Sequence, residues 1–157
     1  MAMKEGDVKE LKTLAADPEK RPAVVRDCGE LIDQEVRSKK GLSGAAVKAA
    51  YSLVKAVKPN IIQSSVESLL DEFTDALDAY YARYQEEGES GTLEDYMAGR
   101  RSDVAESMLS VTDKRAQRST HKTLVKAYQK LRPKGKVHVE LAVPAVGRML
   151  DKHVATL

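Results

Sequence analysis

The chain has 157 residues, of which 42% are hydrophobic and 32% charged, with 26 basic and 24 acidic side chains. This length suits one domain, residues 1–157, and the composition excludes a disordered chain and a membrane-embedded one. The formal charge of +2 is too small to indicate nucleic-acid binding. Helix-favouring residues dominate, whereas β-branched or aromatic runs between turns are missing, so the sequence predicts an all-α fold.

The cysteine count and the chain start predict a cytoplasmic location. Cys28 is the only cysteine and cannot form an internal disulfide, which is typical of a reducing compartment. The first twelve residues are charged without an apolar stretch, so we expect no signal peptide. The apolar stretch Leu141–Gly147 is short and broken by Pro144, so we expect no transmembrane helix.

Apolar residues at helical spacing predict two helices near the start of the chain. The first covers Asp7–Ala15, and Asp17-Pro18 and Arg21-Pro22 break it. The second begins at Pro22, because proline fits the first turn of a helix. Its apolar stripe follows steps of three, four and four residues: Val25, Cys28, Ile32 and Val36.

Gly41-Leu42-Ser43-Gly44 is predicted to form a tight turn, in which Ser43 caps a third helix over Gly44–Val57. Pro59 ends this helix, and the longest helix follows over Asn60–Glu87. Its apolar residues alternate steps of four and three, as expected for a helix in a bundle: Ile62, Val66, Leu69, Phe73, Ala76 and Tyr80.

The second half of the chain begins with a linker, Gly88–Gly91, after which Thr92 and Asp95 resemble a capping box. A helix is then expected from Ser102, and another follows Ser119 and ends at Pro133. The last helix is expected to be interrupted near Pro144. The prediction is therefore a compact all-α bundle of about six or seven helices.

The two sides of the linker, residues 18–87 and 92–157, resemble each other in order. Val47-Lys48-Ala49-Ala50-Tyr51 and Lys58-Pro59 have counterparts in Val125-Lys126-Ala127-Tyr128 and Arg132-Pro133. Two interpretations remain open. One is a duplication that yields two similar three-helix halves, and the other is coincidence in a chain rich in Ala, Lys, Leu and Val.

Three segments resemble a known family. They are Arg21–Val25 (RPAVV), Gly41–Tyr51 (GLSGAAVKAAY) and Lys126–Pro133 (KAYQKLRP). They are similar to segments of a family of small, uncharacterised bacterial all-helical proteins. The resemblance covers most of the chain from Pro18 onward. It implies a bacterial cytoplasmic protein, and it brings no activity because none is assigned to the family.

No motif in the sequence indicates catalysis, a metal or a cofactor. His121, His138 and His153 lack the spacing of a zinc motif, and Cys28 has no cysteine partner for a thiolate site. Cys28 lies on an apolar stripe, where a free cysteine usually acts as a small buried hydrophobe. The carboxylates of the longest helix lack the Glu-x-x-His motifs of metal-binding bundles, which favours a solvated acidic face. We therefore expect no catalytic residues, metal or cofactor.

Charge is divided unevenly along the chain. Residues 67–95 carry ten acids and one base, and residues 113–136 carry nine bases and one acid. Three interpretations compete: mutual neutralisation within the molecule, a protein-interaction surface, and binding of a phosphate backbone by the basic stripe. A cluster of tyrosines, which are enriched at interfaces, adds to the second. The candidate interaction residues are Tyr80, Tyr81, Tyr84, Arg115, Arg118, Lys122, Lys126 and Lys130.

From the sequence we expect a non-enzymatic domain that acts in protein interaction or has a structural role. Its partner would be another protein or a second copy of the chain. The alternative is a nucleic-acid-associated protein that uses the basic stripe. A third class left open by the sequence is an enzyme whose site forms only in the folded chain.

Overall fold

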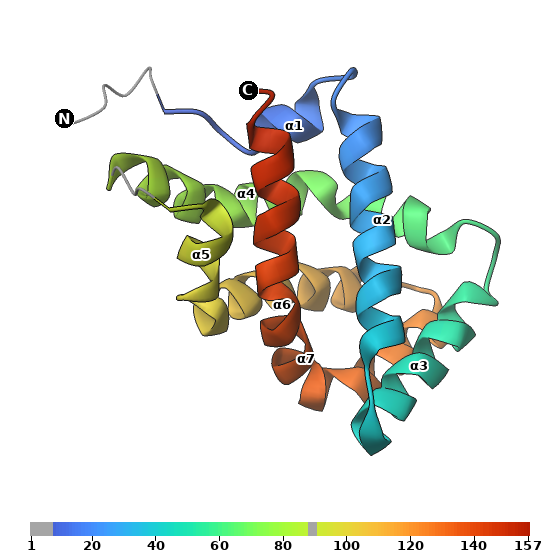
Figure 1. Ribbon diagram of the computed structural model, residues 1–157. Coiled ribbons are helices and arrows are strands. Elements are labelled where there is room, and N and C mark those ends of the chain that lie inside the picture. The colour runs from blue at the N-terminus through green and yellow to red at the C-terminus, as the bar shows by residue number, and fades with distance from the viewer. Residues whose placement is uncertain (1–7, 88–90) are drawn as a thin grey trace.

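The computed structural model describes residues 8–87 and 91–157, which form seven helices and no strands. The predicted all-α class is thus confirmed (Figure 1). The helices are α1 (Lys12–Ala16), α2 (Arg21–Ser38), α3 (Gly41–Lys55), α4 (Ile61–Glu86), α5 (Leu93–Ala98), α6 (Arg101–Arg118) and α7 (Lys122–Val154).

Helix α1 is shorter than the predicted Asp7–Ala15, whose first residue lies outside the described part of the chain. The segment before it is not helical, because its backbone bonds to α4 instead. The backbone N–H of Lys9 donates to Gln85 Oε1 and the Gln85 amide donates to the Lys9 carbonyl, both at 2.8 Å. The N–H groups of Leu11 and Lys12 donate to the carboxylate of Asp78. These contacts set where α1 begins.

The predicted turn at Gly41–Gly44 is wrong, since these residues form the first turn of α3. The connection from α2 is only Lys39 and Lys40. It needs both glycines: Gly41 has φ 74°, and a Cβ on Gly44 would lie 2.7 Å from the carbonyl carbon of Lys39. Ser43 does not cap the helix, and its hydroxyl instead lies 2.6 Å from Nε2 of His138.

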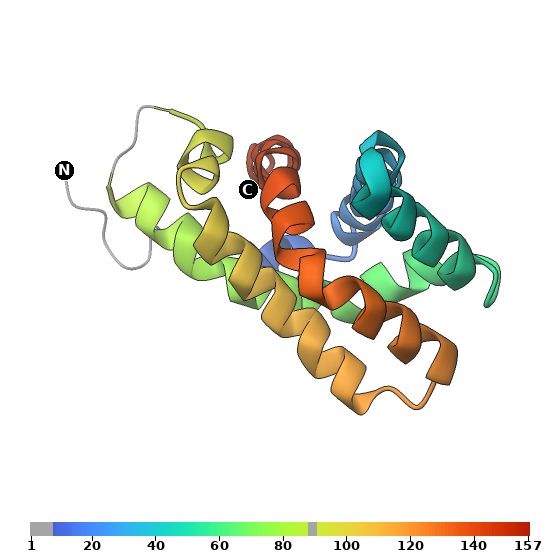
Figure 2. The same cartoon turned by 90° about the horizontal axis from the view of Figure 1, so that it is seen from below.

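The predicted breaks at Pro133 and Pro144 are also wrong, since α7 continues through both prolines for 33 residues. Each proline removes one backbone hydrogen bond, which normally ends or kinks a helix. Here the helix bends instead, and its first part runs across the molecule at a steep angle to its last part (Figures 1 and 2). Packing of both parts on other helices outweighs the local cost, because α7 contacts α2, α3, α5 and α6.

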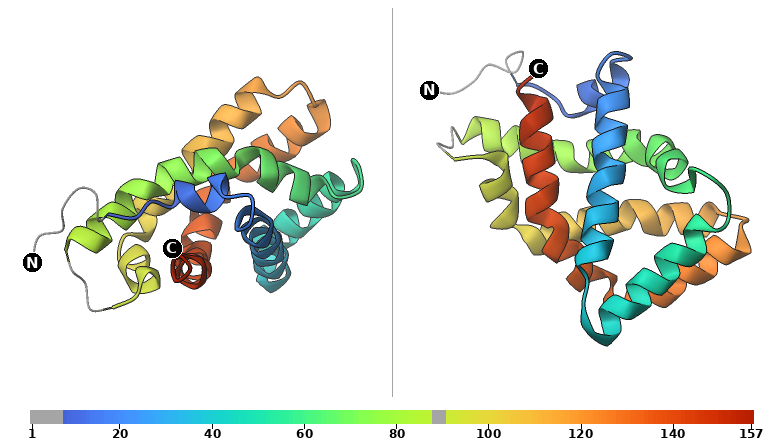
Figure 3. Two further views of the ribbon diagram at one scale, coloured as in Figure 1. Left: turned by 90° about the horizontal axis from the view of Figure 1, so that it is seen from above. Right: turned by 45° about the vertical axis from the view of Figure 1, so that its right-hand side comes forward.

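The core lies where α1, α2, α4, α5 and the start of α6 meet the C-terminal part of α7. Helix α2 and that part of α7 lie side by side (Figures 1 and 3). The approach of α7 to α5 is so close that a Cβ on Gly147 would lie 2.6 Å from Cα of Glu94. The largest fully buried side chains in the described chain are Leu11, Leu14, Val24, Val25, Leu93, Met97, Val104 and Val143.

Candidate functional site

The three candidate tyrosines of α4 are used in internal packing. Tyr81 is only 5% exposed, and its ring stacks on Tyr84 with 6.4 Å between centroids. Tyr84 also meets the ring edge of Tyr96, and its hydroxyl donates to the carbonyl of Gly91 at 2.6 Å. The hydroxyl of Tyr80 bonds to that of Ser107 on α6 at 2.9 Å. The cluster joins α4 to α5 and α6, so its rings and hydroxyl groups are engaged within the molecule.

The five candidate bases all lie on the exposed surface, on two neighbouring helices. Arg115 and Arg118 are in the last turn of α6, and the three lysines (Lys122, Lys126 and Lys130) follow every fourth residue from the start of α7. Arg118 forms an ion pair of 3.1 Å with Glu72 of the acidic helix α4. Part of the charge division seen in the sequence is therefore balanced within the molecule.

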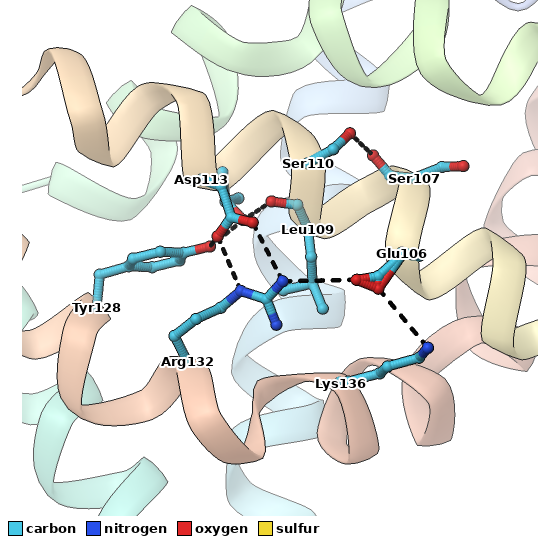
Figure 4. Close-up of polar contacts among 9 residues, drawn as sticks. Glu106, Ser107, Leu109, Ser110, Asp113, Tyr128, Arg132 and Lys136 are labelled. Atoms are coloured by element: carbon cyan, nitrogen blue, oxygen red, sulfur yellow. Dashed lines mark hydrogen bonds and ion pairs between the residues drawn. The ribbon is translucent and has the colours of Figure 1, made fainter.

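A polar network joins α6 to α7 (Figure 4). Arg132 Nε donates to Asp113 at 2.8 Å, and the hydroxyl of Tyr128 donates to the same carboxylate. The bond from Arg132 lowers the pKa of Asp113. Burial, together with the bond to Asp113, raises the pKa of Tyr128 to about 12. Arg132 and Lys136 also lie 3.6 Å from the carboxylate of Glu106. The paired charges indicate that this network holds the two helices together.

One side of α3 is an exposed apolar face. Leu42 is 93% exposed and Leu53 is 53% exposed. The residues between and after them on the same face are exposed alanines: Ala45, Ala46, Ala49 and Ala56. Residues 42, 46, 49, 53 and 56 alternate steps of four and three, which is the spacing of a helix-packing seam. We name this set, Leu42, Ala45, Ala46, Ala49, Leu53 and Ala56, the α3 face.

The residues around the α3 face are basic. Between Val36 and Val66 the chain contains no Asp or Glu, and it carries Arg37, Lys39, Lys40, Lys48, Lys55 and Lys58. Lys55 lies 5.2 Å from the ring centroid of Tyr51 and 3.9 Å from Asp33. Lys40, Lys48 and Lys58 are exposed. The spacing and the acid-free segment are both readable in the sequence, and either could have pointed to this surface.

A groove of about 840 Å³ lies where the start of α4 faces the end of α6 and the start of α7. Lys58, Arg115, Arg118 and His121 line it, together with seven side chains that carry hydroxyl groups. None of the described residues that line it is acidic. The groove is therefore cationic and lined by hydroxyl groups.

Two histidines make buried polar contacts. His153 Nε2 lies 2.7 Å from Asp27, which also accepts a bond of 2.8 Å from Lys152, so α7 is tied to α2. His138 Nε2 faces the Ser43 hydroxyl as a general base faces a nucleophile. However, Nδ1 of His138 is buried without a hydrogen-bond partner in the described structure, so no carboxylate orients the ring. Burial, with Lys39 and Lys134 nearby, lowers the pKa of His138.

Cys28 is half-buried where it packs against the core, and this burial raises the pKa of its thiol to about 11. Such a thiol is a poor nucleophile at neutral pH. Among the described residues, no group of three or more His, Cys, Asp or Glu side chains is arranged to hold a metal ion. Within the same residues, no helix is both long and apolar enough to cross a membrane.

Comparison with known proteins places the chain in a family. A family model described as a family of unknown function (DUF6918) matches residues 11–154. The chain belongs to this family. The match begins at Leu11, just before α1, and ends at the last residue of α7, so it includes every described helix. Neither the curated proteins nor the solved structures contain a match to this chain.

Proposed function

We propose that this DUF6918 chain is a non-enzymatic protein-interaction domain of the bacterial cytoplasm, and that the α3 face docks an acidic amphipathic helix of a partner protein. The observation that carries the proposal is the exposure of Leu42 and Leu53 at the two ends of a helical seam. Large apolar side chains in that position lose contact with water when a second helix packs along α3. The lone cysteine and the family resemblance support the cytoplasmic location.

The alanines of the α3 face favour a helix as the occupant. Small side chains let two helix backbones approach closely, whereas they bury little area in a lipid surface. Helices that lie on membranes usually carry bulky Trp, Phe and Leu side chains on their apolar side. The α3 face offers two leucines and four alanines. Its composition therefore suits a packed helix better than a membrane.

The lysines around the face determine the charge of the partner. In an antiparallel pair of two α3 helices about Ala49, Lys40 of each copy would lie level with Lys58 of the other. Like charges at such positions disfavour pairing, and opposite charges favour it. A second copy of the chain is thus a poor occupant. A helix with Glu or Asp beside its apolar seam is a good one.

The test uses a synthetic, fluorescently labelled helical peptide that has a Leu/Ala seam flanked by Glu, and a matched peptide with Lys in place of Glu. Fluorescence anisotropy measures binding to the full chain. We expect the Glu peptide to bind with an affinity that falls as salt rises, and the Lys peptide to bind at least about tenfold more weakly. The double variant Leu42→Glu/Leu53→Glu should lose binding. The control variant Ala79→Glu, at an exposed position of α4, should retain it.

Equal binding of the two peptides, or unchanged binding by the double variant, would refute the proposal. Two other occupants have their own signatures. A concentration-dependent dimer in light scattering that Leu42→Glu/Leu53→Glu abolishes would assign the face to a second copy. Co-sedimentation with vesicles of phosphatidylserine and phosphatidylcholine that the same variant abolishes would assign it to a membrane. Either result would show that the α3 face binds that occupant and not a helix of a partner protein.

A second candidate function is binding of a nucleic-acid backbone by the exposed stripe of α7. The three lysines project from successive turns, and no ion pair with an acid is seen for them in the described chain. Cations in a row neutralise phosphates and release counterions. Size exclusion at low salt with absorbance at 260 and 280 nm tests this, with the charge-reversed variant Lys122→Glu/Lys126→Glu/Lys130→Glu. If nucleic acid stays bound to this variant, the lysine stripe of α7 is not the binding site.

A further inference from the structure

At two places in the chain, an aspartate of a later helix accepts hydrogen bonds from the backbone N–H groups at the start of a short helix. Asp78 of α4 accepts hydrogen bonds from the backbone N–H groups of Leu11 and Lys12, where α1 begins. Asp151 of α7 accepts bonds of 2.9 Å from the N–H groups of Leu93 and Glu94, where α5 begins. A carboxylate on a later helix thus satisfies the free donors of an earlier short helix in both cases.

A second contact also occurs twice. The hydroxyl of Tyr51 on α3 donates to Asp33 on α2, and Lys55, four residues after the tyrosine, lies 3.9 Å from the same aspartate. The hydroxyl of Tyr128 on α7 donates to Asp113 on α6, and Arg132, again four residues on, binds it at 2.8 Å. Asp33 and Asp113 are each the thirteenth residue of an 18-residue helix.

A third pair of contacts crosses between the two parts of the chain. Tyr80 of α4, two residues after Asp78, bonds to Ser107 of α6. His153 of α7, two residues after Asp151, bonds to Asp27 of α2. Ser107 and Asp27 are both the seventh residue of their helices. Each part therefore uses its last long helix to hold the matching position of the other part, which is the exchange that a twofold axis produces.

We infer that the chain is a duplicated helical unit whose two copies pack about a pseudo-twofold axis. Helices α1 to α4 form the first copy, and α5 to α7 form the second. The two parts of α7 then correspond to α3 and α4, and Pro133 corresponds to Pro59. The alignment that fits the contacts pairs Leu77-Asp78 with Leu150-Asp151, and it adds α1 and α5 to the three-helix halves suggested by the sequence.

A circular permutant of the full chain tests the duplication. The Lys9 ammonium donates to the Leu157 carbonyl at 2.9 Å, so Leu157 can be joined to Met1 while the chain is opened between Glu87 and Gly88, which exchanges the order of the copies. We expect cooperative unfolding with a Tm within about 4 °C of the parent. The control, opened between Ser119 and Thr120, divides one copy and should be less stable. If the first permutant is the less stable one, the inference is wrong.

The two copies differ at one pair of matching junctions. At the first junction, α3 of the first copy meets the last part of α7. At the second junction, the first part of α7 meets α4 of the first copy. On one side the Lys39 ammonium reaches the carbonyl of His138, and Ser43 meets the His138 ring, so side chains bridge the junction. On the other side lies the open groove of about 840 Å³, where Ser65 is the counterpart of His138. Because side chains bridge this junction on one side, the fold does not depend on leaving the matching junction open on the other side.

We propose that this groove is a binding site for a small phosphorylated molecule, independent of the docking of a partner on α3. Its cations attract a phosphate, and Arg115 presents a planar guanidinium that can bind two phosphate oxygens at once. Hydroxyl groups from both walls, including those of Ser64, Ser65 and Thr120, donate to the remaining oxygens. The volume is in the range of ligand sites in proteins. The lack of acids among its described lining residues avoids repulsion of an anion.

Isothermal titration of the full chain with inorganic pyrophosphate tests the site. We expect saturable binding that Arg115→Gln weakens by about tenfold, because a hydrogen bond to a charged group is lost. The control is Lys114→Gln, which removes the same charge from the neighbouring exposed residue that does not line the groove. Absent binding at millimolar pyrophosphate, or equal weakening by the two variants, would overturn the proposal. Displacement of pyrophosphate by a DNA oligonucleotide that binds more tightly would assign the phosphate to a nucleic-acid backbone instead.

Discussion

Replacing Gly147 by alanine should destabilise the protein, although alanine favours a helix by about 1 kcal/mol over glycine. The added Cβ would lie 2.6 Å from Cα and 3.2 Å from the backbone nitrogen of Glu94, so α5 and α7 must separate. Overpacking of this kind costs about 1–3 kcal/mol. The clash is with backbone atoms, and the Glu94 N–H is held by Asp151, so we place the cost near the upper end. The expected net loss is about 2 kcal/mol.

Gly29→Ala is the matched control, because it makes the same change inside α2, where a Cβ would meet no atom within 4 Å. It should stabilise the protein by about 0.5–1 kcal/mol. For a chain of this size the two variants should shift the Tm by about 4–8 °C downward and about 1–4 °C upward. Circular dichroism at 222 nm during thermal and urea unfolding measures both. A Gly147→Ala variant as stable as the parent would refute the close approach of α5 and α7.

Three further outcomes follow from other contacts. Burial alone would raise the pKa of Asp27, but the bonds from Lys152 and His153 outweigh it and lower the pKa. The contact of the Asp27 carboxylate with Lys152 and His153 therefore stabilises the protein above about pH 4, and this contribution is lost as the pH falls through the lowered pKa of Asp27. Asp27→Asn should flatten the acid side of a stability–pH curve measured by urea unfolding. Cys28 should react with a thiol reagent at pH 8 far more slowly in the folded protein than in urea, and equal rates would contradict its burial. Asn60 has φ 62°, so Asn60→Gly should keep the parent's Tm, whereas Asn60→Val should lower stability by about 1–2 kcal/mol.

Local chemistry made several features predictable. The cap of α5 was predicted from Thr92 and Asp95, and the Asp95 N–H does donate to the Thr92 hydroxyl at 3.1 Å. The cap needs only residues three apart, so no distant packing can move it. The long helix α4 was likewise predicted to within one residue at each end, because a strong apolar seam and Pro59 define it.

Other features depend on contacts that no local pattern contains. The course of α7 through Pro133 and Pro144 is decided by packing against four other helices, which outweighs a local cost of about 3 kcal/mol for each proline. The exposed side of α3 cannot be read from the sequence, because α3 has apolar residues on more than one side. Ala50 is buried while Ala49 is exposed, and periodicity alone cannot tell which of the two a neighbour covers.

The end of α7 has a consequence for how this protein is made. Asp151 holds the start of α5 and His153 holds Asp27 of α2, so residues in the last two turns complete contacts far back in the chain. Synthesis proceeds from the N-terminus at about 5–20 residues per second, so these residues leave the ribosome after the helices whose contacts they complete. The earlier helices thus wait with their apolar sides uncovered until the end of α7 has been made. A premature stop before Asp151 would leave them without their closing contacts, and the cell's chaperones and proteases would meet that exposed surface first.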